Sequence, residues 1–227
     1  MSNLELALDD LRRNLLEMVD LVNHQLSNCK EAIHKNDEDL AEEVISMDKR
    51  VNAMELKIDK DCESILALYN PVATDLRFVM AALKTNHDLE RIGDNIRGMA
   101  KAFRGVRDTK ASGFYSIFQI SDMFDIVVSI LDNVRDAMES DDTKLVRKIF
   151  KKDAKLDKLD EKSLLIAAKL LKANPTKSTT ILSLYTIAKK LERIGDLSTN
   201  LGEEMIFHIE AKVLKHKKKL KKDFSKK

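Results

Sequence analysis

The stretch Leu89-Glu90-Arg91-Ile92-Gly93-Asp94 is repeated letter for letter as Leu191-Glu192-Arg193-Ile194-Gly195-Asp196, 102 positions further along the chain. Each copy separates a Glu from an Asp by four positions. Residues with this spacing share one face of an α-helix, about 40° apart around its axis. The sequence therefore predicts an internal repeat that is built twice around a helix carrying a carboxylate pair.

The composition is that of a helical globular protein. At 227 residues the chain can bury one large core or two smaller ones. Its content of 44% hydrophobic and 34% charged residues excludes a disordered chain. Two prolines and six glycines are too few to interrupt long helices often. The lack of Trp and the low aromatic content disfavour stacking of bases, so no nucleic-acid partner is expected.

The sequence favours a cytoplasmic location. Cys29 and Cys62 are far apart and form no C-x-x-C pair, which is typical of reduced thiols in the cytosol. The N-terminus has neither the basic region nor the apolar region of a signal peptide. No run of 18 apolar residues is present, so no membrane-spanning helix is expected.

Apolar residues spaced three and four apart predict six long helices. Ser2 and Asp37 are placed to cap the first two helices. Asn70-Pro71 and Asn174-Pro175 end the second and fifth, because a residue before proline is pushed out of helical geometry. A linker is predicted at 105–113. The predicted helices are 3–34, 38–69, 72–104, 114–139, 143–173 and 178 to 215 or beyond.

Two matching sets of three helices predict an all-α fold of two tandem three-helix bundles related by an internal repeat. The predicted units are a first repeat at 1–107, a second at 108–211 and a basic C-terminal extension at 212–227. The extension carries nine lysines against one aspartate. Two interpretations of it stay open, a docking segment for an anionic membrane surface and a tail that only solubilises the chain.

Both repeats also carry an acidic stripe on the helix before the repeated motif. At 100° per residue, the four polar positions on the second helix fall within about 60° of one another. The fifth helix repeats the first three positions, and Leu164 stands where a fourth carboxylate would match Asp59. The stripe residues are Asp48, Asn52, Glu55 and Asp59 in the first repeat, and Asp153, Asp157 and Asp160 in the second.

Two interpretations of these stripes were weighed. The first is a solvated helix face, which a chain this rich in charge can form by accident at a cost of a few tenths of a kcal/mol per pair. The second is a metal site, because facing carboxylates that lose solvent repel one another unless cations compensate. Oxygen ligands suit Mg, Mn, Ca or Fe, and also zinc. His87 lies one turn before Glu90 on roughly the same face, which makes it a candidate ligand. Because Lys189 takes this place in the second repeat, a hydrogen-bonded surface histidine is the preferred interpretation.

At these residues the sequence resembles the PhoU family of bacterial phosphate-signalling proteins. The resemblance rests on three stretches of the first repeat and on the repeated motif of the second, and the two-copy plan covers nearly the whole chain. The stretches are Met47-Asp48-Lys49-Arg50-Val51-Asn52, Leu68-Tyr69-Asn70-Pro71-Val72-Ala73-Thr74-Asp75-Leu76-Arg77 and Asp88 to Asp94 in the first repeat, and Leu191 to Asp196 followed by Asn200 in the second.

The resemblance implies a cytoplasmic negative regulator of phosphate uptake and phosphate-starvation signalling. Such a protein acts as an adaptor between a phosphate ABC transporter and a sensor histidine kinase at the membrane, and a homodimer is expected. Some members carry multinuclear iron or zinc clusters, with Mg or Mn as alternatives here. The implied ligands are Asp48, Asn52, Glu55, Asp59, Glu90 and Asp94, and then Asp153, Asp157, Asp160, Glu192, Asp196 and Asn200.

Two departures from the family pattern bear on these sites. Gly98 stands where an Asn equivalent to Asn200 is expected, and Leu164 replaces the last carboxylate of the second stripe. A metal-dependent enzyme, for example a carboxylate-bridged hydrolase or oxidase, is the alternative to a regulator. The sequence offers no nucleophile–base pair, P-loop or dinucleotide fingerprint, so a regulator without catalytic residues is the preferred prediction.

Overall fold

The computed structural model describes residues 2–104, 106 and 112–214. The first repeat consists of α1 (Asn3–Lys35), α2 (Glu38–Tyr69) and α3 (Ala73–Phe103). Ser2 and Glu5 form a capping box at the start of α1, and Asp37 accepts a hydrogen bond from the backbone of Leu40 at the start of α2. The second helix has the predicted bounds, α1 is one residue longer at its end, and α3 is one residue shorter at each end.

The second repeat contains α4 (Ser112–Phe118), α5 (Ile120–Ser140), α6 (Thr143–Ala173), a short 3-10 turn (Pro175–Lys177) and α7 (Ser178–Glu210). The prediction of one helix over 114–139 was wrong, because Gln119 adopts a left-handed conformation, with a φ of 54°, and divides it into α4 and α5. The last helix ends at Glu210 and not near 215, because Ala211 also adopts a left-handed conformation, with a φ of 54°. Most of the predicted linker and of the basic extension lies outside the described residues.

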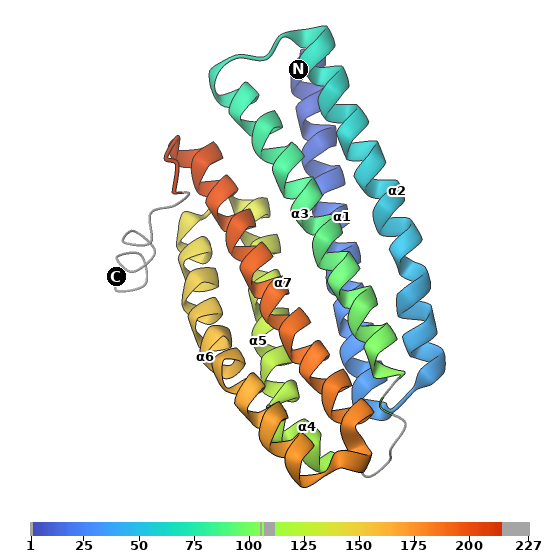
Figure 1. Ribbon diagram of the computed structural model, residues 1–227. Coiled ribbons are helices and arrows are strands. Elements are labelled where there is room, and N and C mark those ends of the chain that lie inside the picture. The colour runs from blue at the N-terminus through green and yellow to red at the C-terminus, as the bar shows by residue number, and fades with distance from the viewer. Residues whose placement is uncertain (1, 105, 107–111, 215–227) are drawn as a thin grey trace.

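The two repeats share one core. Figure 1 shows α3 and α7 side by side in the middle of the molecule, with α2 and α6 on opposite flanks. α1 packs on α5 behind them, and the buried apolar side chains of both repeats form one connected cluster. The all-α repeat fold is confirmed, while the domain boundaries stay a prediction. In the described ranges no helix is long and apolar enough to cross a membrane.

Candidate functional site: two facing acidic surfaces

The glycine of the repeated motif brings the two acidic helices of each repeat together. A Cβ atom on Gly93 of α3 would lie 3.0 Å from Val51 Cγ1 of α2. A Cβ atom on Gly195 of α7 would lie 2.6 Å from Leu156 Cδ2 of α6. Such distances leave no room for a side chain, so each glycine marks a close approach of two helices. We call the α2–α3 and α6–α7 surfaces beside these glycines the first and second acidic surfaces.

One end of the first acidic surface gathers three possible metal ligands. Glu55 of α2 and His87 and Glu90 of α3 each offer a ligand atom within 4.8 Å of the others. His87 Nδ1 lies 3.9 Å from a Glu55 carboxylate oxygen. Burial raises the pKa of both Glu55 and Glu90, and the charges of Asp59 and Asp94 raise it further. This end therefore holds carboxylates that are partly desolvated and repelled by their neighbours.

The other end of the first acidic surface is neutralised by an arginine. Arg97 donates hydrogen bonds to Asp48 at 2.9 Å and to Asp94 at 2.6 Å. Asp48 is buried, and its Oδ1 atom has no hydrogen-bond partner among the described residues. Asp59 accepts a hydrogen bond from Asn86 at 2.9 Å, and Asn52 is exposed. The first acidic surface thus has two different ends. Arg97 neutralises Asp48 and Asp94 at one end, and no lysine or arginine of the described residues pairs with Glu55 or Glu90 at the other.

The second acidic surface gathers its three possible ligands at the other end. Asp153 and Asp157 of α6 and Asp196 of α7 each offer an oxygen within 4.8 Å of the others. These residues match Asp48, Asn52 and Asp94, so the group occupies the end that Arg97 neutralises in the first repeat. Arg193 lies 3.3 Å from an Asp196 oxygen on the same helix.

A lysine compensates the remaining end of the second acidic surface. Lys189 Nζ lies 2.7 Å from an Asp160 oxygen and 3.4 Å from a Glu192 oxygen. Burial raises the pKa of Glu192, with a further contribution from the charge of Asp196. Leu164 is exposed, and Asn200 lines a cavity together with α3 residues. Lys189 therefore neutralises Asp160 and Glu192, whereas no lysine or arginine of the described residues forms an ion pair with Glu55 or Glu90.

Two cations of these surfaces, Arg97 and Lys189, were missed as functional candidates from the sequence. His87 was named as a possible ligand, although a surface histidine was preferred, and Arg97 was not considered. Lys189 entered only as a reason to set His87 aside. A signal was present for each, because Lys189 and His87 precede the motif glutamate by three positions and Arg97 follows Asp94 by three.

The donor sets fit metal ions. Two carboxylates with an imidazole suit zinc or iron, and three carboxylates suit Mg, Mn or Ca. The groups would supply three ligands each, which leaves coordination positions for water or for a partner. Nothing in this geometry forms a nucleophile with an adjacent base, so what it can do chemically is hold a cation and stiffen the contact between two helices.

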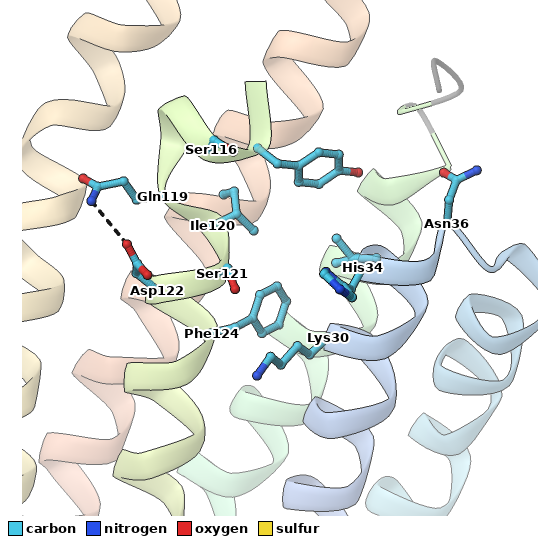
Figure 2. Close-up of a pocket in the computed structure, with 11 residues that line it drawn as sticks. Lys30, His34, Asn36, Ser116, Gln119, Ile120, Ser121, Asp122 and Phe124 are labelled. Carbon is cyan, nitrogen blue, oxygen red and sulfur yellow. Dashed lines mark hydrogen bonds between the residues drawn. The ribbon is translucent and has the colours of Figure 1, made fainter. Parts of the chain in front are cut away.

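A large cavity lined by described residues lies away from the acidic surfaces. Its volume is about 620 Å³, and it opens between the end of α1 and helices α4 and α5. Figure 2 shows Lys30 and His34 of α1 across from Phe124 of α5, with Gln119 bonded to Asp122 at one side. It contains none of the predicted ligands, so size alone does not identify the site.

Two repeated helical units with paired acidic surfaces define a class of all-α repeat proteins. Comparison with known protein families and structures identifies the family. A family model described as the PhoU domain matches residues 15–103 and again 120–205. The chain is 34% identical to the phosphate-specific transport system accessory protein PhoU of Serratia marcescens, over 92% of this chain and 85% of that protein. It is 32% identical to the Escherichia coli K12 protein of the same name, over 92% and 86%.

The solved structures agree with this assignment. The crystal structure of PhoU from Pseudomonas aeruginosa matches with a TM-score of 0.86 and 28% identity, over 92% of this chain and 99% of that one. The chain belongs to the PhoU family, and its role is that of a phosphate transport accessory or regulatory protein. The expected fold class and family are confirmed.

Proposed function

We propose that this protein is a cytoplasmic negative regulator that links a phosphate ABC transporter to a sensor histidine kinase. The observation that carries the proposal is the match of both repeats to the PhoU domain, together with relatives named as phosphate-specific transport system accessory proteins. The relatives are named as accessory or regulatory and not as enzymes, which supports a role without catalysis. A homodimer belongs to the same proposal.

Deleting the gene from its own bacterium tests this regulatory role. In phosphate-rich medium the deletion should raise phosphate uptake and switch on a phosphate-starvation reporter, and re-expression of the full chain should reverse both. A tagged copy should retain transporter and kinase subunits when solubilised membranes are passed over it. Unchanged uptake and reporter activity in the deletion strain would contradict the proposal.

We further propose that one group of three clustered side chains on each acidic surface binds a metal ion. The first would use Glu55, His87 and Glu90, and the second would use Asp153, Asp157 and Asp196. The proposal is supported by the short distances within each group and by the desolvation that raises the pKa values of Glu55 and Glu90. Because carboxylate ligands must be ionised, occupancy should fall as the pH drops.

Elemental analysis of protein purified without chelators tests the metal proposal. We expect iron, zinc or manganese to copurify, and the stripped protein to gain thermal stability when the metal is restored. The double variant Glu55→Gln/Glu90→Gln should lose the metal of the first group, with Glu38→Gln/Glu43→Gln as a control on the exposed N-terminal part of α2. An absence of metal together with no stabilisation by added Mn, Fe or Zn would contradict it.

An activity assay on the same metal-loaded protein distinguishes a regulator from the alternative, a metal-dependent enzyme. A carboxylate-bridged hydrolase or oxidase would turn over model substrates when loaded with Mn or Fe, and the Glu55→Gln/Glu90→Gln variant would lose that turnover. A regulator would bind the metal and show no turnover above the stripped protein.

The basic extension, 212–227, is proposed as a membrane-docking segment. Removal of residues 216–227 would test this role on acidic liposomes at low salt.

A further inference from the structure

A basic cleft lies at the contact between the two repeats, on the side of α3 that faces α7. It is lined by Arg91, Arg97 and Lys101 of α3 and by Lys190 of α7, and its volume is about 320 Å³. Asp94 is the one carboxylate that lines it. Arg91, Asp94, Arg97 and Lys101 follow one another at intervals of three, three and four, so they share one face of the helix. The cleft thus concentrates four cationic side chains around a space open to solvent.

Lys190 reaches the cleft because position 98 is a glycine. A Cβ atom on Gly98 would lie 2.5 Å from both Cε and Nζ of Lys190, so any side chain there would displace the lysine. The ammonium group therefore rests directly on the backbone of α3. Among the described residues neither Lys190 nor Lys101 forms an ion pair or a hydrogen bond. The departure from the family pattern at Gly98 accordingly makes room for a cation from the other repeat.

The two arginines of the cleft are held in place by carboxylates. Arg97 is fixed by Asp48 and Asp94, and Arg91 lies 3.5 Å from Asp88. A guanidinium group has five N–H donors, so Arg97 keeps donors for a ligand after both of these bonds are made. Fixing the side chains in advance lowers the entropy that a ligand must overcome on binding.

The chemistry of the cleft matches a phosphate group. Planar guanidinium groups bind phosphate oxygens in pairs, and lysines add compact positive charges. Hydrogen phosphate can accept hydrogen bonds from cations on several sides and can donate its own O–H to Asp94, whereas a carboxylate offers fewer directions and sulfate has no O–H to donate. We propose that this cleft binds a phosphate group, either as inorganic phosphate or as the terminal group of a small phosphate ester. This goes beyond the proposed function, because it requires neither a bound metal nor a partner protein.

The test is isothermal titration of the full-length, EDTA-treated protein with inorganic phosphate and, separately, with ATP in the absence of metal. Sulfate serves as a control for simple charge attraction. The informative variant is Lys101→Met/Lys190→Met, because methionine keeps the apolar stem of each side chain and removes its charge. Lys169→Met/Lys172→Met, with two exposed lysines of α6 outside the cleft, removes the same charge and is the matched control. Circular dichroism checks that both variants are folded.

We expect phosphate or ATP to bind the wild type, and the cleft variant to bind at least about tenfold more weakly, since two partly screened charges are lost. The α6 variant should bind as the wild type does. Binding of phosphate itself would identify the free ion as the ligand, and binding of ATP alone would identify a phosphate ester. The proposal is overturned if neither ligand binds, if sulfate binds equally well, or if both double variants weaken binding to the same extent.

Discussion

The two acidic surfaces are built from equivalent positions, yet their side-chain cations lie at different ends. In the first repeat Arg97 bonds to Asp48 and Asp94, and among the described residues no lysine or arginine forms an ion pair with Glu55 or Glu90. In the second repeat Lys189 pairs with Asp160 and Glu192, and the end that matches Asp48 and Asp94 gathers three aspartates, of which Asp196 also lies 3.3 Å from Arg193. The difference at the end around the motif glutamate comes from one position, which is His87 in the first repeat and Lys189 in the second.

The comparison shows how a duplicated sequence acquires two different sites. A carboxylate pair between packed helices needs a positive charge, which can be a side chain of the protein or a bound ion. Where the chain supplies the cation, the surface is satisfied without a metal. Where it does not, the burial and the neighbouring negative charges that raise the pKa values of Glu55 and Glu90 are not offset by a lysine or arginine of the described residues.

Removing Arg97 should have the largest effect on stability. The Asp48 side chain is 7% exposed, so the variant Arg97→Met leaves a buried carboxylate without its partner. We expect the free energy of unfolding to fall on the order of 2 kcal/mol. The equivalent change Lys189→Met affects carboxylates that are more exposed and should cost about 0.5–1 kcal/mol. Urea unfolding in EDTA measures both, and equal losses would show that the two cations are interchangeable.

Exchanging the residues before the motif should exchange the metal preferences of the two surfaces. His87→Lys places an internal cation beside Glu55 and Glu90, so zinc affinity at the first surface should fall at least tenfold, about 1.4 kcal/mol. Lys189→His removes the cation from Asp160 and Glu192 and offers an imidazole in its place, so the second surface should gain zinc affinity. Competition titrations with a zinc indicator report both effects.

Lys190→Met is a control for this exchange. Lys190 is the next residue of α7 after Lys189, and it forms no ion pair with Asp160 or Glu192. This variant should leave zinc binding at both surfaces unchanged. If His87→Lys retained the wild-type affinity, the imidazole would not be a ligand and the first surface would have to be assigned without it.

The two motif glycines should differ in their tolerance of alanine. At Gly195 a Cβ atom would meet Leu156 Cδ2 at 2.6 Å and Asp153 Oδ1 at 2.7 Å, whereas at Gly93 the nearest atom, in Val51, is 3.0 Å away. Overpacking lowers the free energy of unfolding by roughly 1–3 kcal/mol. Replacing glycine by alanine within a helix raises it by up to about 1 kcal/mol, because alanine is the better helix former. Gly195→Ala should therefore lose about 1 kcal/mol more than Gly93→Ala in thermal unfolding. A larger loss at Gly93 would mean that α2 and α3 are the closer pair.

The smallest effect is expected from the pH dependence of the first surface. The pKa of Glu90 is raised in the folded protein above its ordinary value of 4.5. Its favourable contribution to stability is therefore present in full below pH 4.5 and is lost as the pH rises through the folded-state pKa. At neutral pH the metal-free variant Glu90→Gln should be more stable by a few tenths of a kcal/mol, because repulsion from Asp94 is removed.

Urea unfolding between pH 4.5 and 8 in EDTA measures this effect, and Glu192→Gln is the matched variant in the second repeat. Glu192→Gln should raise the free energy of unfolding by less than Glu90→Gln does, since it also removes the ion pair with Lys189. A loss of stability at neutral pH for Glu90→Gln would show that Glu90 has a favourable partner that outweighs the repulsion.

Much of the fold was predictable because it depends on neighbours along the chain. Apolar residues three and four apart, the caps at Ser2 and Asp37 and the Asn-Pro breaks set the helix ends locally, and α2 and α6 have the predicted bounds. The break at Gln119 was missed because neither a glycine nor a proline marks it. The end of α7 was missed because nothing in Ala211 indicates a left-handed conformation.

By itself the sequence determined the all-α fold, the duplication and the carboxylates that line each helix pair, since these follow from spacing along a helix. It also determined the family, through the resemblance of its repeated motifs. Only the tertiary structure decided which carboxylates meet which cation. The contact of Arg97 with Asp48 spans 49 positions, and the contact of Lys190 with Gly98 joins the two repeats. Such pairs depend on how each helix is rotated about its axis and how closely it approaches its neighbour. The packing of one shared core sets both, and no local pattern records them.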